Sequence, residues 1–294
     1  MHVFVQVLIS GILVGGLYGV ISSGLSLTFG VSKISNFAHA DFVTVGMYLA
    51  VVSVGVLHSW GLLLLPVIAL AVGGLGMLMY VLLLRRTHVS AVTEEEAHLP
   101  QIVITAAIST LIQSVLLSVF TSGNRSIDTV LSGSWRVAGV ALPKSQVVAF
   151  VIAAAAFVAL DVVVSRTEFG RGLRAIVDDG EAAAVVGVNR GRMLAASAGI
   201  GIGLAGLAGG LLATYQTVNP TSGFGYLALA FVVVILGGLG SIRGAFIAGI
   251  IVGILQQATG TYIALDGQNI AVWILFLVVL LFRPAGLFGK RLAL

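Results

Sequence analysis

Nine nearly uninterrupted apolar stretches dominate this chain of 294 residues, and they restrict it to a membrane-embedded fold. A helix needs about 20 apolar residues to cross the roughly 30 Å hydrocarbon core of a bilayer. Charged residues supply only 9% of the composition, where a soluble domain has about 25%. The stretches cover approximately residues 3–29, 42–57, 61–84, 100–120, 146–165, 193–214, 226–241, 244–258 and 269–282.

We therefore predict an all-α fold, a polytopic membrane helix bundle of about eight to ten transmembrane helices in a single domain, residues 1–294. Two places leave the helix count open. The first stretch is long enough to hold one span plus a half-helix. The glycine-rich segment 237–244 fits either a tight hairpin or a broken helix.

The basic residues predict which loops face the cytoplasm, because Lys and Arg gather on that side of membrane proteins. When Arg85 and Arg86 are placed there and the spans alternate, 12 of the 15 basic residues fall on one side. The loop at about 166–192 and the C-terminus are then cytoplasmic, and the loop at about 121–145 is external. The side of the N-terminus stays open. The other basic residues on the cytoplasmic side are Lys33, Arg166, Arg171, Arg174, Arg190, Arg192, Arg243, Arg283, Lys290 and Arg291.

Glycines recur at helical spacing in two of the stretches. Small residues on one helix face let backbones approach closely in lipid, so we expect tight helix packing there. These glycines are Gly11, Gly15 and Gly19 in the first stretch, and Gly199, Gly203, Gly206 and Gly210 in the sixth.

A charged, glycine-punctuated segment, Phe169–Arg192, stands out in this apolar chain. Asp178 and Asp179 can cap a short helix, Ala182–Val186 continues it, and Gly187 is placed to end it. A helix of such small side chains can press into a groove on a partner, and nearby arginines can pair with acids there. An ordinary connector is the alternative, but connectors are usually shorter. The segment therefore predicts a docking surface.

No sequence signature of catalysis accompanies it. The only Gly-Lys pair, Gly289–Lys290, lacks the remaining residues of a phosphate-binding loop. The five histidines show no metal-ligand spacing, and cysteine is absent. We expect no enzyme activity, cofactor or metal in this chain. The membrane orientation explains the positive net charge, so nucleic acid is not expected as a partner.

Two polar breaks precede apolar stretches, Ser35–Asp41 in the first half and Tyr215–Gly223 in the second. Polar groups at membrane depth are costly unless they line a protein-enclosed path. The first break also fits a helix start, with Ser35 or Asn36 as cap and Asp41 in the first turn. Interrupted helices in both halves of a chain are typical of inverted repeats. The candidate pathway residues are Asn36, Phe37, His39, Asp41, Thr105, Asn219 and Phe224.

Six segments together carry a family resemblance: Gly24–Val31, Asn36–Phe42, Gly46–Ala50, Glu181–Asn189, Gly237–Gly244 and Arg283–Gly289. Along nearly its whole length the chain resembles the inner-membrane permeases of branched-chain amino-acid ABC importers (LivH-like). The family commonly has glycine where Ala40 stands, and often proline where Arg243 stands.

The resemblance implies a multi-pass permease subunit of the bacterial inner membrane that forms half of a path for branched-chain amino acids or a related small solute. It also implies the partners: a second homologous permease, two cytoplasmic ABC ATPase subunits and an extracytoplasmic solute-binding protein. The Glu181–Gly187 helix would couple the chain to the ATPases. The candidate coupling residues are Arg171, Arg174, Glu181, Ala182, Ala183, Gly187 and Arg190.

Two alternatives remain at this point. An ion-coupled secondary transporter would need buried acids as coupling sites, for which Asp41 and Asp161 are the candidates. We interpret Asp161 as interfacial rather than as part of a proton relay. A channel or a structural membrane partner is the second alternative.

Overall fold

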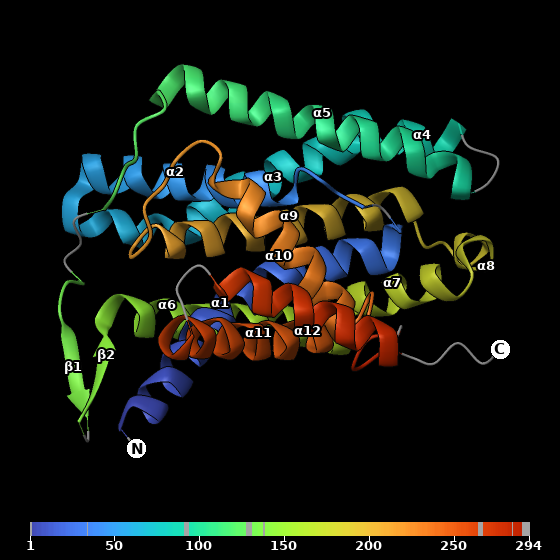
Figure 1. Ribbon diagram of the computed structural model, residues 1–294. Coiled ribbons are helices and arrows are strands. Elements are labelled where there is room, and N and C mark those ends of the chain that lie inside the picture. The colour runs from blue at the N-terminus through green and yellow to red at the C-terminus, as the bar shows by residue number, and fades with distance from the viewer. Residues whose placement is uncertain are drawn as a thin grey trace.

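The computed structural model describes residues 2–33, 35–90, 94–127, 131–137, 139–263, 267–283 and 285–289. Lys290 and Arg291, two of the basic residues used above for orientation, and Pro284 of the C-terminal motif lie outside these ranges. The helices run along a common axis in an elongated bundle (Figure 1). A two-stranded hairpin lies at one end, here called the hairpin end, and α8 lies at the other, here called the α8 end (Figure 1).

Every predicted apolar stretch falls on a helix. Seven helical segments are long and apolar enough to span a membrane, and two shorter apolar helices, α10 and α12, bring the described total to nine. The main helices are α1 His2–Ser32, α2 His39–Leu57, α3 Leu65–Met79, α5 Glu94–Phe120, α6 Lys144–Arg166, α9 Arg190–Leu212, α10 Ser222–Gly237, α11 Ile242–Tyr262 and α12 Gln268–Phe282. The shorter elements are the 3₁₀-helix His58–Leu64, the π-helix Tyr80–Leu84, α4 Arg85–Ser90, β1 Ser134–Val137, β2 Val140–Pro143, α7 Glu168–Asp178 and α8 Gly180–Val185.

The structure decides both open points of the helix count. The first stretch is one continuous helix of 31 residues, α1, roughly 46 Å long at 1.5 Å per residue. It begins at the hairpin end, where Gln6 exchanges two hydrogen bonds of 2.6 and 2.8 Å with the backbone of Ala141 in β2. The segment 237–244 is a tight hairpin, because Gly238 and Gly240 have φ of 96° and 82° and Ser241 caps α11.

The glycine faces produce the predicted close packing. A β-carbon at Gly15 of α1 would lie 2.7 Å from the carbonyl oxygen of Gly249 in α11, and one at Gly203 of α9 would lie 2.9 Å from that of Ala69 in α3. The two long helices α1 and α9 also cross backbone to backbone: a β-carbon at Gly201 would lie 2.5 Å from the carbonyl oxygen of Gly24. No larger residue fits these crossings without moving a helix.

The two halves of the bundle share a pattern of helix directions and contacts. Helix α1 runs from the hairpin end to the α8 end, packs on α11 and leads through a polar break into α2 (Figure 1). Helix α9 runs the opposite way, packs on α3 and leads through the other polar break into α10. This is the arrangement of inverted-topology repeats.

Asp161 lies near the α8 end of α6 and forms a two-point ion pair with Arg243 at the start of α11. The guanidinium Nε and Nη2 atoms are 2.6 and 2.9 Å from the two carboxylate oxygens. The interfacial interpretation of Asp161 therefore agrees with the structure, since a surface arginine neutralises its charge. The arginine that departs from the family pattern joins α6 to α11.

We predict that Gly15→Ala lowers the free energy of unfolding by about 1–3 kcal/mol, because the added methyl group pushes α1 from α11. Gly74→Ala on α3 is the matched control, since a β-carbon there meets nothing within 4 Å. It should be neutral or slightly stabilising, as alanine favours helix more than glycine does. Denaturant unfolding in detergent micelles measures both; equal stability of the two variants would contradict the packing account.

Candidate functional site

Helix α2 begins inside the bundle rather than at its end. The Nε2 atom of His39, in the first turn of α2, lies 3.1 Å from the carbonyl oxygen of Ile21 in α1. Ile21 stands 11 residues before the last residue of α1, Ser32, and so about 16 Å from that end. The chain therefore turns back beside the end of α1 before α2 starts, and Figure 1 shows this connection running back into the bundle.

Helix α10 also begins inside the bundle, and it meets the start of α2 there. A β-carbon at Gly223 would lie 2.8 Å from the carbonyl oxygen of Ala40 and 2.9 Å from the Oγ1 atom of Thr44. The rings of Phe37 and Phe231 pack at 5.6 Å between centroids. The two breaks that the sequence predicts are thus neighbours, although about 180 residues separate them in the chain.

The prediction that Ser35 or Asn36 caps α2 is wrong, because Ala38 occupies the N-cap position and no side chain caps the helix, but the prediction that Asp41 lies in the first turn is confirmed. The Oδ1 atom of Asn36 accepts a hydrogen bond of 3.0 Å from the backbone of Ala38, which stabilises the turn ahead of the helix. Asp41 occupies the first turn, where the positive end of the helix dipole favours a carboxylate. Asn36, His39 and Asp41 are all buried, so this non-helical backbone is enclosed by protein, as it must be at membrane depth.

Asn219 and Phe224 contribute differently. The Oδ1 atom of Asn219 accepts hydrogen bonds from the backbone and the hydroxyl of Thr221, at 3.0 and 2.9 Å, and so shapes the turn that starts α10. Phe224 is 73% exposed on the outside of α10, and the structure does not bring it to the other predicted pathway residues.

A polar edge of α5 completes the site. Gln113 donates hydrogen bonds of 2.9 Å to Asp41 and 3.3 Å to the hydroxyl of Ser109, and Thr105 donates one of 3.4 Å to the carbonyl oxygen of Ser35. Thr105 is among the predicted pathway residues, whereas its polar neighbours are not; their signal is a polar residue at every fourth position from Gln101 to Gln113. We call this set the polar seam; it comprises Asp41 of α2 and Gln101, Thr105, Ser109 and Gln113 of α5.

The charged segment Phe169–Arg192 lies at the α8 end and contains the predicted short helix, α8. The Oδ1 atom of Asp179 accepts from the backbone amides of Glu181 and Ala182, both at 3.0 Å, and so caps the helix. Gly187, at φ 88°, ends it. Glu181, Ala182 and Gly187 are exposed, whereas Ala183 is buried.

The structure adds two exposed apolar residues to this surface. Val185 and Val186 at the end of α8 are 88% and 77% exposed. Their sequence predicts only that they continue the helix, because exposure cannot be read from a run of small apolar residues. Together with Glu181 and Ala182 they form the outer face of α8.

A second helix in the segment, α7, was not predicted. Leu173 and Ile176 form its buried face, but Gly170 and Gly172 hide the helical pattern. Gly170 is required because a β-carbon there would collide with the carbonyl oxygen of Val164, where α7 turns back on α6.

The arginines differ in how free they are. Arg174 donates a 2.7 Å hydrogen bond to the carbonyl of Val164 and so fastens α7 to the end of α6, rather than standing free for a partner. Arg171 is exposed and pairs with Glu168 at 3.3 Å. Arg190, also exposed, stands next to Gly180 of α8.

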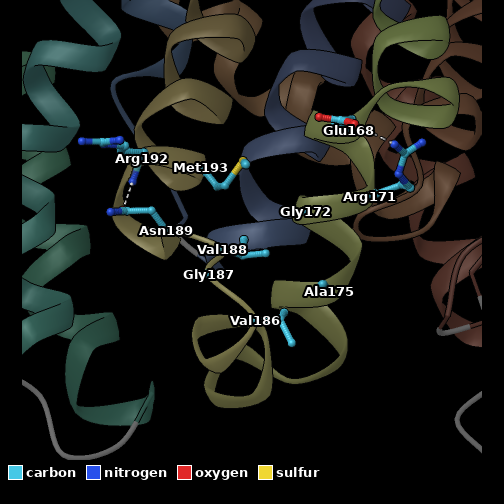
Figure 2. A pocket seen from close by; sticks show the side chains of 10 residues that line it. All are labelled: Glu168, Arg171, Gly172, Ala175, Val186, Gly187, Val188, Asn189, Arg192 and Met193. Carbon is cyan, nitrogen blue, oxygen red and sulfur yellow. Dashed lines mark hydrogen bonds and ion pairs between the residues drawn. The ribbon is translucent and has the colours of Figure 1, made fainter.

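A pocket of about 510 Å³ opens between α7 and the first turn of α9. Figure 2 shows Glu168 and Arg171 on one wall and Asn189, Arg192 and Met193 on the other. The Oδ1 atom of Asn189 caps α9 by accepting from the amide of Arg192 at 3.0 Å. The remaining lining residues are Gly172, Ala175, Val186, Gly187 and Val188.

A helix bundle with two buried breaks and an exposed helix at one end has the architecture of a membrane transport subunit. Residues 7–283 match the family described as the permease component of branched-chain amino acid transport systems, and the chain belongs to this family. Members are transport subunits of ABC importers, not enzymes.

Individual relatives cover almost the whole chain. The chain is 28% identical over 298 residues to the high-affinity branched-chain amino acid permease BraD of Pseudomonas aeruginosa, covering 98% of this chain and 96% of that protein. It is 28% identical to LivH of Escherichia coli with the same coverage, and 27% identical to a probable LivH of Methanocaldococcus jannaschii, covering 97% and 92%. No solved structure matches.

We predict that Asp179→Ala loosens α8, because two amides lose their acceptor, a change that costs about 1 kcal/mol of helix stability. Hydrogen exchange at residues 180–187 should become several-fold faster. Asp178→Ala is the control, since the side chain of Asp178 makes no hydrogen bond in the described part of the chain. Unchanged exchange in Asp179→Ala would show that α8 does not depend on this cap.

Proposed function

We propose that this chain is one of two transmembrane subunits of an ABC importer for branched-chain amino acids or a related small solute. A second, homologous permease supplies the other half of the path. Two ATPase subunits bind on the cytoplasmic side, and a solute-binding protein delivers the solute from the other side. The observation that supports this proposal most strongly is the pair of buried helix breaks that meet inside the bundle. They occur in a member of the permease family that also presents an exposed helix with apolar residues at its end.

The orientation follows from charge. The basic residues near α7, α8 and the start of α9 gather at the α8 end, whereas Arg136 lies on the hairpin (Figure 1). The positive-inside rule supports a cytoplasmic α8 end and an external hairpin end. Since α1 is a single helix, its first residues then lie outside and the last described residues, which pack against the end of α10, lie inside.

The outer face of α8 fits the role of ATPase contact. Exposed valines at a helix tip in aqueous surroundings are unfavourable unless a partner covers them. Glu181 on α8 and Arg190 next to Gly180 supply exposed charges of both signs for pairing, which supports specific docking.

Force on α8 has two routes into the bundle. Arg174 ties α7 to the end of α6, and the turn after α8 leads directly into the capped start of α9. Helix α9 ends at the break before α10, so it connects the α8 end with the region where α10 meets α2. Coupling and solute passage are thus carried by different ends of the same helix.

We predict that Val185→Asp lowers ATP-driven uptake at least tenfold in the assembled importer, while membrane insertion is unchanged. The cause is a charge buried at the proposed ATPase contact, which costs several kcal/mol when unpaired. Uptake and ATP hydrolysis by reconstituted proteoliposomes measure the effect. Glu181→Lys should act in the same direction.

Val3→Asp is the matched control, because Val3 is an exposed valine at the hairpin end. It should transport like the unmodified importer. Full uptake by Val185→Asp would remove α8 from the coupling role. Uptake driven by an ion gradient without ATPase subunits would instead favour a secondary transporter.

A further inference from the structure

Asp41 is an unusual charge for the interior of a membrane bundle. It is only 2% exposed, and no other Asp or Glu side chain that the structure describes is buried. Both ion pairs in the described part of the chain, Arg171–Glu168 and Arg243–Asp161, lie elsewhere. Acidic groups at this depth are expensive and are retained for function.

The surroundings of Asp41 compensate its charge only in part. The carboxylate accepts a hydrogen bond from Gln113, a neutral donor that also donates to the hydroxyl of Ser109. The start of α2 adds the equivalent of about half a positive charge. No full positive charge faces the carboxylate within the described residues.

Buried polar atoms without partners lie on α2 and on α5, on either side of Asp41 along the bundle. The hydroxyl of Tyr48, two turns after Asp41, has no hydrogen-bond partner although the residue is 1% exposed, and its ring stacks on Phe120 of α5 at 4.3 Å. The Nε2 atom of Gln101, on the polar edge of α5, is likewise buried without a partner. Such groups cost free energy unless a ligand or water satisfies them.

Helix α5 lies on the outside of the bundle (Figure 1). Only 11% of its 18-residue apolar segment is buried, compared with 78% for α9. The seam can therefore open by a movement of α5 that leaves the glycine-packed helices in place.

We propose that the polar seam holds the ammonium group of an amino-acid solute during its passage, with Asp41 as the counter-charge and Ser109 and Gln113 as hydrogen-bonding neighbours. A primary ammonium carries three donors and one charge, which match a carboxylate, a hydroxyl oxygen and an amide oxygen. This inference rests on the proposed function and assigns to the permease itself a selection for amino acids over acids of the same shape.

The absence of cysteine from the chain permits a direct test. In the assembled importer in nanodiscs, Ser109→Cys places a thiol in the seam, and Thr110→Cys places one on the exposed neighbouring position of α5. The labelling rate with a neutral methanethiosulfonate is read from the mass of this chain. Leucine and 4-methyl-2-oxopentanoate, which replaces the ammonium by a keto oxygen, are the two probes.

Leucine should slow labelling of Ser109→Cys at least fivefold, the keto acid should leave it unchanged, and Thr110→Cys should respond to neither. Adding Asp41→Asn should remove the protection, and Asp41→Glu should retain part of it. Gln113→Cys serves as a second reporter if Ser109→Cys fails to assemble.

Equal protection by both probes, protection by sodium chloride alone, or protection that survives Asp41→Asn would overturn the inference. Uptake by the unmodified importer separates the two proposals. Leucine uptake without any protection of the seam contradicts only this site, whereas ATP-dependent uptake of no amino acid contradicts the proposed function.

Discussion

The backbone contact between α1 and α9 is the constraint on which the rest of the bundle depends. Gly24 and Gly201 bring the two longest central helices together without side chains between them. Each is then backed by its own glycine-packed partner, α11 for α1 and α3 for α9. In lipid no hydrophobic effect drives helices together, so this close packing has to supply the association energy.

This rigid centre makes the two breaks tolerable. Because α1 and α9 are fixed, the chain can turn back beside each of them and start α2 and α10 in the interior, with the freed backbone enclosed by protein. Helix α5 lies at the edge of the bundle and contacts the centre through its polar edge and through apolar residues such as Ile108, Ile112 and Leu116. The bundle thus combines a close-packed centre with a peripheral helix beside its buried carboxylate.

Periodicity and composition predicted much of this from the sequence. The nine apolar stretches, the glycine faces, the two polar breaks and the capped helix α8 depend on local residue patterns, and the structure contains all of them. That the two breaks meet is visible only in the structure. The polar edge of α5 and helix α7 were not predicted, because their roles depend on tertiary contacts. Gln113 is recognisable as a site residue only because it faces Asp41, and Gly170 is recognisable as required only because it packs against Val164. The orientation of the chain in the membrane and the path of the solute depend on lipid and on partner subunits. Local sequence patterns suggest both but do not determine them.

The distance between α2 and α5 tests most directly whether the seam opens by a movement of α5 during the ATP cycle while α1 and α11 stay packed together. Spin labels at Val52 and Leu117 report on the seam, and labels at Val5 and Ile263 report on α1 and α11; all four positions are exposed. Double electron–electron resonance on the assembled importer should show a shift of several ångströms for the first pair between nucleotide-free and ATP-trapped states, and none for the second. Equal shifts in both pairs, or none in the first, would contradict the account.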